Sequence, residues 1–128
     1  MNADILTLCD KLECPPNGKV SFIGVFEFLK PGKVPLQIHQ FTAVAKIRFK
    51  LEEGETHSYQ IKIISPDGQV IAKKDPSTFS TKPFPDKKYA FAYISEEIIG
   101  LPIPTRGTYS VVFEVDKANA WDIPLFVI

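Results

Sequence analysis

The chain has 128 residues, of which 45% are hydrophobic and 12% aromatic; this supplies one hydrophobic core and excludes an intrinsically disordered protein. Lys plus Arg and Asp plus Glu both number 15, so the formal net charge is zero. A neutral chain has no overall field that attracts nucleic acid or an anionic membrane, so any such binding must be local. We expect one domain that spans residues 1–128.

The first part of the chain predicts strands separated by turn-forming residues. Alternating apolar residues indicate strands over Ala3–Leu12 and Lys19–Leu29, with a turn over Cys14–Gly18 between them. Gly24 predicts a bulge or a close crossing of the backbone. Two prolines and a glycine make Lys30–Gln40 an expected irregular crossover between sheets.

The middle of the chain predicts a hairpin. Apolar and polar residues alternate over Phe41–Leu51 and again over His57–Ser65, and a five-residue loop separates the two runs. Folding the chain about this loop pairs Phe49 with Tyr59. We therefore expect these two runs to be neighbouring antiparallel strands.

The next segments predict a turn, a short strand and a long excursion. Ser65–Gly68 fits a type I turn, so Gln69–Lys73 is expected to be a strand. Lys74–Lys88 is rich in Pro, Ser, Thr and Lys and predicts a surface excursion. Alternation resumes over Tyr89–Ile94, and Ser95–Leu101 is expected to form at most one short helical turn.

The end of the chain predicts a second hairpin. The runs Gly107–Val115 and Trp121–Ile128 fold about a five-residue connection, which places Phe113 opposite Ile123 on an apolar face. Such a face must be buried. Counting the runs gives seven or eight strands and predicts an all-β protein, specifically an immunoglobulin-like antiparallel β-sandwich.

The sequence contains no recognisable catalytic or zinc motif. His39 and His57 are the only histidines, and we interpret both as ordinary loop or strand-end residues. Cys9 and Cys14 are too few for a zinc site, and a disulfide between them is the less favoured alternative. We expect no enzyme activity and no cofactor. Five aspartates at expected loops or strand ends leave a calcium-like site as an alternative: Asp67, Asp75, Asp86, Asp116 and Asp122.

A basic stripe is expected on the hairpin in the middle of the chain. Its register places Lys46 opposite Lys62, with Arg48 and Lys50 farther along the same face. These four residues are weak candidates for binding an anion. In this register no aromatic residue lies between them to stack on a base, so we favour a solvated sheet face and expect no nucleic-acid partner.

Four residues are candidates for binding a protein partner. Phe79 and Phe84 lie in the proline-rich excursion, where exposed aromatic rings could anchor a partner, although they could instead fold back and cap the sandwich. Pro124 cannot donate to a strand ladder, so the last strand, including Phe126, is expected to have a free edge. That edge could support self-association.

Several segments carry a resemblance to a known family. NADILTLCD, GKVSFIGVF, ISPDGQVI and GTYSVVFEVD resemble a small uncharacterised bacterial family, a domain of unknown function made of one stand-alone β-sandwich. The resemblance implies that fold and a bacterial cytoplasmic setting, and it transfers no active site. The first residues also lack the pattern of a secretory signal, and no apolar run has the length of a membrane helix, so we expect a cytoplasmic protein without membrane association.

Together these features predict a non-catalytic binding or assembly module that acts through loop aromatics or an edge strand. The alternative is a small-ligand or metal-ion domain that uses the loops at one end of the sandwich. Nothing in the sequence identifies the partner or the ligand.

Overall fold

The structure is a computed structural model that describes residues 1–83, 85 and 88–128. In the described part, strands form almost all regular structure, and a single turn of 3-10 helix, η1, spans Leu51–Glu53. This confirms the expected all-β class. The strands, in chain order, are β1 (Asn2–Cys9), β2 (Lys11–Glu13), β3 (Ser21–Ile23), β4 (Phe28–Leu29), β5 (Leu36–Lys50), β6 (Thr56–Ile64), β7 (Val70–Lys73), β8 (Ser77–Ser80), β9 (Lys82–Pro83), β10 (Tyr89–Ile103), β11 (Gly107–Val115) and β12 (Asn119–Val127).

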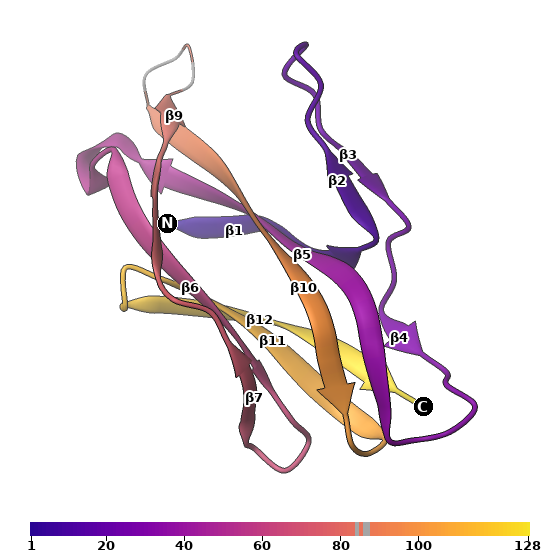
Figure 1. The fold of residues 1–128 in the computed structure, drawn as a ribbon. Helices are drawn as coiled ribbons and strands as arrows, with labels where there is room; N and C mark the ends of the chain where they lie inside the picture. Colours follow the sequence, from indigo (N-terminus) through magenta and orange to yellow (C-terminus); the bar gives the residue numbers. More distant parts are fainter. Residues whose placement is uncertain (84, 86–87) are drawn as a thin grey trace.

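The strands belong to three sheets. The first has the order β1-β5-β10-β9, and the second has the order β4-β12-β11-β6-β7, with β8 also paired to β6. The pairs are antiparallel except for β12 with β4, which is parallel. In Figure 1, β5 and β10 lie across β11 and β12, and the third sheet, the hairpin β2-β3, extends away from both as an arm.

One hydrophobic core joins the two larger sheets. Buried residues alternate with less buried ones throughout β11 and along Ala90–Ile94 of β10 and Ile123–Val127 of β12, as the two-residue period of a strand requires. In β5 the five consecutive residues Phe41–Ala45 are all buried, and alternation resumes after them. Removing each large aliphatic or Phe side chain from water stabilises the fold by about 1.5–3 kcal/mol. The largest fully buried side chains are Tyr109, Phe41, Phe49, Phe113, Leu8, Ile47, Ile61, Ile63, Leu101, Ile103, Leu125 and Val44.

The prediction that Phe41–Leu51 and His57–Ser65 form a hairpin is wrong. β5 pairs with β1 and β10, whereas β6 pairs with β11, β7 and β8. The segment between them, η1 followed by Gly54 in the left-handed region, carries the chain from one sheet to the other. The alternation agrees with the burial of His57–Ser65 and of Ala45–Phe49, whereas Phe41–Ala45 is buried on both faces. Alternation indicates which face is buried but does not identify the neighbouring strand.

The closing hairpin forms, but with a register that differs by two residues from the expected one. Phe113 lies opposite Trp121 instead of Ile123. The reason is a tighter connection, because Asp116 and Lys117 both adopt positive φ angles, 54° and 57°, and the Ala118 amide donates to the Val115 carbonyl. A shift of two residues keeps every side chain on its predicted face.

The two long strands of the first sheet extend beyond the predicted limits. Ser95–Leu101 is part of β10 and forms no helical turn, and Leu36–Gln40 of the expected crossover belongs to β5. These two stretches are antiparallel neighbours, with Ile99 opposite Gln40. Each supplies the hydrogen-bonding partner that makes the other a strand, and a single-sequence pattern does not reveal such a partner.

The N-terminal strands are more broken than expected. The first expected strand divides at Asp10 into β1 and β2, and Lys19–Leu29 yields only the short strands β3 and β4. The predicted close crossing at Gly24 is confirmed, since a Cβ atom there would collide with the Asp10 carboxylate. With two further short strands in the 74–88 excursion, the described residues contain twelve strands instead of seven or eight.

Two corners of the fold are held by local hydrogen bonds. The predicted turn at Ser65–Gly68 is confirmed, with the Gly68 amide 2.9 Å from the Ser65 carbonyl and β7 following at Val70. Between β10 and β11, the buried Tyr109 hydroxyl donates to the Thr105 carbonyl at 2.7 Å. The Thr105 amide donates back to the same hydroxyl at 3.3 Å. This tyrosine ties the start of β11 to the loop that precedes it.

Candidate functional site

The outer face of the first sheet carries the cations of β5. Ala45, Ile47 and Phe49 are fully buried, so the residues that alternate with them point away from the core. Those residues are Lys46, Arg48 and Lys50, of which the first two are half-buried and Lys50 is exposed. Three of the four candidate anion-binding residues therefore do share one face.

The neighbouring strand β10 places an aromatic residue beside each of these cations. Ala90, Ala92 and Ile94 are buried, and the residues between them face outward. The register places Tyr89 opposite Lys50, Phe91 opposite Arg48 and Tyr93 opposite Lys46. We call these six residues the aromatic–cationic face. The expectation that no aromatic residue accompanies the cations is thus wrong, because it depended on pairing β5 with β6.

The rings and the cations are in contact. The Lys46 ammonium lies 5.6 Å from the centre of the Phe91 ring and 5.9 Å from that of Tyr93. The Arg48 guanidinium carbon lies 5.3 Å from the centre of the Tyr89 ring. At these distances the ring quadrupole attracts the cation. The rings therefore hold two cationic groups at the surface without neutralising their charge.

The carboxylate of Asp4 forms an ion pair with a cation of this face. The Arg48 Nε atom lies 3.3 Å from an Asp4 carboxylate oxygen, and both side chains are about one-third exposed. The contact runs through Nε of the guanidinium. Lys46 and Lys50 have no recorded ion pair among the described residues. The face accordingly keeps a local excess of positive charge on a neutral chain.

Residues of this face line two hollows of the surface. A groove of about 560 Å³ separates β10 from the tip of the β2-β3 arm; Phe91 and Tyr93 line one side, and Cys14–Pro16 and Val20 line the other. Lys19 and Lys82 add two cations to its rim. A smaller hollow of about 100 Å³ includes Arg48, Lys50 and Tyr89. The groove contains two rings of the aromatic–cationic face, and the smaller hollow contains two of its cations and its third ring.

The fourth candidate cation lies elsewhere. Lys62 is on β6 in the second sheet, where it pairs with Lys73 of β7 and Val112 of β11. The predicted stripe with Lys46 opposite Lys62 is therefore not formed. Lys46 and Lys62 lie on different sheets because β5 and β6 do not pair with each other.

Phe79, a candidate partner-binding residue, packs inward. Its ring centre lies 6.0 Å from that of Phe49, 5.8 Å from that of His57 and 5.8 Å from that of Tyr59. Phe79 therefore packs against the core, as expected if it folds back, and it also lines the groove beside the arm. The second aromatic candidate of this segment, Phe84, lies outside the described residues.

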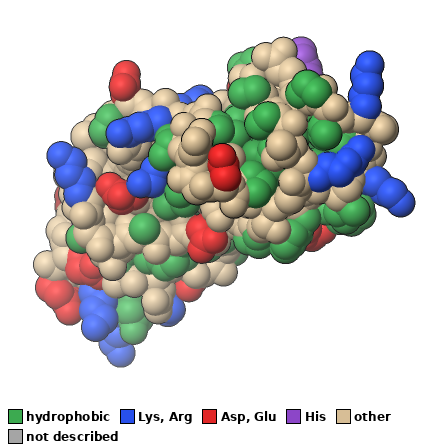
Figure 2. Space-filling model, turned by 90° about the horizontal axis from the view of Figure 1, so that it is seen from below, with side chains coloured by type: hydrophobic (Ala, Val, Ile, Leu, Met, Phe, Trp, Pro, Cys, Tyr) green, Lys and Arg blue, Asp and Glu red, His purple; other side chains and the backbone are tan. Residues whose placement is uncertain are grey.

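Pro124 and Phe126 lie on an exposed edge region of the second sheet. The Phe126 amide donates to the Glu27 carbonyl, so the nitrogen of Pro124, two residues earlier, faces the same side of β12, away from β11. β4 covers only the end of this edge, where Phe28 lies beside Phe126. Phe28, Phe126 and Ile128 are 53%, 42% and 57% exposed. Figure 2 shows hydrophobic side chains gathered on the half of the lower face that holds β4 and the C-terminus in Figure 1.

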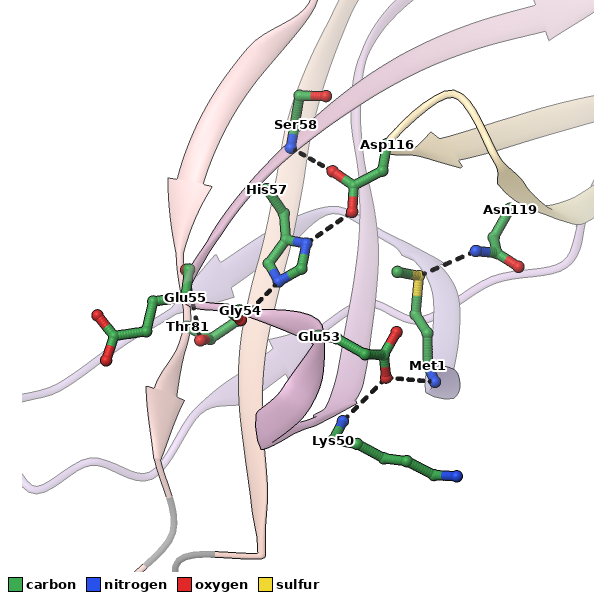
Figure 3. A network of polar contacts seen from close by, with 10 residues as sticks. All are labelled: Met1, Lys50, Glu53, Gly54, Glu55, His57, Ser58, Thr81, Asp116 and Asn119. Atoms are coloured by element: carbon green, nitrogen blue, oxygen red, sulfur yellow. Dashed lines mark hydrogen bonds and ion pairs between the residues drawn. The ribbon is translucent and has the colours of Figure 1, made fainter.

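A buried polar network surrounds His57, a residue expected from the sequence to be an ordinary loop or strand-end histidine. His57 is 4% exposed and stacks on Phe49 with ring centres 4.1 Å apart. Its Nδ1 lies 2.6 Å from an Asp116 carboxylate oxygen, and its Nε2 lies 2.9 Å from the Gly54 carbonyl. The Ser58 amide donates to the other Asp116 oxygen at 2.9 Å. Figure 3 shows these contacts linking β6 to the β11-β12 connection.

The network lowers the pKa of two carboxyl groups. Burial alone would raise the pKa of Asp116, but the hydrogen bonds from Ser58 and His57 outweigh it, so the pKa is lowered. The pKa of Glu53 is likewise lowered against the effect of burial, because its carboxylate accepts from the Met1 ammonium and the Lys50 amide. Both ring nitrogens of His57 thus contact oxygen atoms of the protein, and the network clamps β6 to the β11-β12 connection.

The acidic residues considered for calcium are dispersed or already bonded. Asp67 accepts from the Ser65 hydroxyl in its turn, Asp116 is engaged by His57, and Asp86 lies outside the described residues. Within residues 1–83, 85 and 88–128, no three His, Cys, Asp or Glu side chains come together in a metal-binding arrangement. Cys9 is buried, Cys14 is exposed, and both are free thiols.

A protein-family model matches residues 4–128 of the chain, and its description is a family of unknown function, DUF6941. No curated protein matches the sequence. In the part of the chain that the structure describes, no helix has the length and apolar character needed to cross a bilayer.

Proposed function

The chain belongs to the family of unknown function DUF6941, and we propose that it is a non-catalytic binding module that holds an anionic ligand on the aromatic–cationic face. The observation that carries this proposal is the register of β5 against β10, which alternates Lys46, Arg48 and Lys50 with aromatic rings. The groove beside the arm adds depth to an otherwise open sheet face.

The electrostatics of the face support an anion. Three cations lie at two-residue intervals on one strand, and among the described residues the ion pair between Arg48 and Asp4 is the one recorded for their side chains. Because Lys46 and Arg48 rest on aromatic rings, their head groups are already oriented, which reduces the entropy lost when a ligand binds.

The test is thermal unfolding with and without inorganic polyphosphate at low ionic strength. Binding to the native state raises Tm, so we expect the wild-type protein to be stabilised. The double variant Lys46→Gln, Arg48→Gln should lose this stabilisation, whereas Lys62→Gln, which removes a lysine from the other sheet, should keep it. The proposal fails if polyphosphate leaves the wild-type Tm unchanged, or if Lys62→Gln loses as much as the double variant.

We further propose that residues 1–128 form one immunoglobulin-like sandwich domain, and a cytoplasmic setting for it. The shared core of the two larger sheets supports the sandwich assignment. The hydrogen bond from the Tyr109 hydroxyl to the carbonyl of Thr105, four residues earlier, also supports it. A tyrosine near the start of a strand that bonds back across the preceding corner is a hallmark of these sandwiches. An experimental structure in which the two sheets fail to face each other would overturn this assignment.

A second candidate function, self-assembly, is favoured by the apolar patch at the β4-β12 edge. Phe28 and Phe126 lie side by side and are about half exposed, with Ile128 next to them. Native mass spectrometry of the wild-type protein should then report a dimer that Phe126→Lys dissociates. A wild-type monomer at high micromolar concentration would eliminate this candidate and leave the anion-binding proposal unaffected.

A further inference from the structure

We propose that the ligand of the aromatic–cationic face is a short stretch of single-stranded nucleic acid; this inference rests on the proposed anion-binding function and names its ligand class. The face combines the two features that such binding requires, namely cations that follow a backbone and aromatic rings on which bases stack. Both features are present at each of three consecutive levels of the β5-β10 pair.

The spacing of the levels favours a polymer. Residues on one face of a strand repeat every two positions, or about 6.6–6.8 Å along the strand. The backbone of an extended single strand presents phosphate and base at a comparable repeat. A single nucleotide would use one level, whereas Lys50 with Tyr89, Arg48 with Phe91 and Lys46 with Tyr93 form three in line.

In the proposed complex, the cations of β5 contact the phosphates and the aromatic rings of β10 contact the bases. Arg48 is paired through Nε to Asp4, and because a guanidinium has five N–H donors, Arg48 has further donors for a phosphate oxygen. Tyr93 lines the groove beside the arm, and Tyr89 lines the smaller hollow. A base can therefore enter each hollow beside a ring while the phosphates follow β5.

The chemistry also separates a single strand from other polyanions. A duplex hides its base faces, so Tyr89 and Tyr93 would add nothing to its binding. An acidic peptide has charges to match Lys46 and Arg48 but no ring system to stack at each repeat. We therefore expect the affinity to fall in the order single strand, duplex, acidic peptide.

The first measurement is fluorescence anisotropy with a labelled oligothymidylate, in parallel with an abasic phosphodiester of the same length, a duplex and poly-glutamate. Contact with three phosphates predicts that log K falls with log salt with a slope of about −2. Equal affinity for the abasic strand or for poly-glutamate would overturn the nucleic-acid proposal and leave anion binding intact. Failure of every polyanion to bind at low salt would overturn both proposals.

The second measurement compares variants of the full chain. Tyr93→Leu should weaken oligothymidylate binding about fivefold or more and leave abasic-strand binding unchanged, because stacking one base contributes at least this factor. Tyr93→Phe keeps the ring and should retain the affinity. Lys46→Gln should weaken the binding of both oligothymidylate and the abasic strand, and Lys62→Gln should weaken the binding of neither.

The outcomes of the variant series are decisive in either direction. Equal effects of Lys46→Gln and Lys62→Gln would overturn the assignment of this face. Equal losses for Tyr93→Leu and Tyr93→Phe would overturn the stacking role of the ring. If Tyr93→Leu does not fold, Tyr89→Leu makes the same test at the more exposed ring.

Discussion

At the scale of single residues, the most constrained side chain is His57. Both of its ring nitrogens face oxygen acceptors, the Asp116 carboxylate and the Gly54 carbonyl, and a carbonyl can only accept. Asp116 also accepts from the Ser58 amide while it holds a positive φ angle that favours Asp, Asn or Gly. One carboxylate thus fixes both the histidine and the tight connection between β11 and β12.

The lowered pKa of Asp116 predicts acid sensitivity. A carboxyl group whose pKa is lower in the folded state adds stability above its ordinary value of 3.8, and this stability is lost as the pH falls through the folded value. Asp116→Asn tolerates the same backbone conformation but cannot ionise. We expect the variant to be about 1 kcal/mol or more less stable at pH 7 and to lose less stability on acidification.

Urea denaturation of the wild type and Asp116→Asn between neutral and acidic pH measures both effects. The control is Asp122→Asn, because Asp122 is an exposed residue of β12 outside the His57 network. Parallel pH profiles for the wild type and Asp116→Asn would contradict the role given to the Asp116 carboxylate.

Tyr59 provides a second prediction at this scale. Burial, a hydrogen bond to Glu96 at 2.6 Å and the Glu96 charge raise the pKa of Tyr59 to about 12. A raised pKa means that its contribution to stability is complete below the ordinary value of 10 and is lost as the pH rises toward 12. Titration by tyrosinate absorbance should show a step near pH 12 that is absent in Tyr59→Phe. An identical titration of the variant would refute this.

The residue-scale patterns of the sequence identified which side chains are apolar, but not which polar groups meet. His57 and Asp116 are 59 residues apart in the chain. Their contact requires β6 and β11 to be neighbours, and no local pattern states that they are. The sequence therefore predicts an ordinary loop or strand-end residue at His57, and only the structure shows that this strand-end histidine is buried and bonded to Asp116.

At the scale of elements, the candidate site depends on which strand pairs with β5. The same β5 cations that would have formed a plain basic stripe beside β6 are combined with Tyr89, Phe91 and Tyr93 beside β10. Alternation is equally satisfied by either neighbour, because both present a residue of the right parity. Only the paired sheet reveals that the aromatic residues and the cations share a surface.

The attachment of the β2-β3 arm depends on Gly24. Its φ angle is +70°, and a Cβ atom would collide with the Asp10 carboxylate, where the Asp10 amide also donates to the Ile23 carbonyl. Gly24→Ala should therefore lower the free energy of unfolding by about 1–3 kcal/mol and loosen the arm. Hydrogen exchange of the amides in β2 and β3, together with urea denaturation, measures this.

Gly18→Ala is the matched control for the arm. Gly18 also has a positive φ angle, +80°, but nothing lies within 4 Å of its added Cβ atom. Gly18→Ala should therefore lower the free energy of unfolding only by the cost of backbone strain, without the effect of a collision. Equal destabilisation by the two substitutions would mean that the Asp10 contact does not hold the arm.

At the scale of the whole molecule, the corner at Tyr109 joins the two sheets. The chain passes from β10 in the first sheet to β11 in the second, and the buried Tyr109 hydroxyl bonds to both the amide and the carbonyl of Thr105. Tyr109→Phe keeps the ring in the core but leaves these backbone groups unpaired. We expect a loss of about 1–3 kcal/mol in the free energy of unfolding, measured by urea denaturation.

Tyr93→Phe is the control for the corner, since it removes a hydroxyl from the outer face of the first sheet, where water can replace it. A loss in Tyr109→Phe no larger than that in Tyr93→Phe would show that the corner contributes little to the junction of the sheets.

The sequence by itself determined the all-β class, the inward faces of His57–Ser65 and of the last two strands, the Ser65–Gly68 turn and the close crossing at Gly24. Each of these follows from short-range physics: the two-residue period of a strand, the conformations open to Pro and Gly, and the burial of apolar residues. Only the tertiary structure decided the neighbours of β5 and β6, the register of the last hairpin and the joining of cations with aromatic rings. These depend on long-range pairing, in which several partners satisfy the same local pattern and the packing of the whole core selects one.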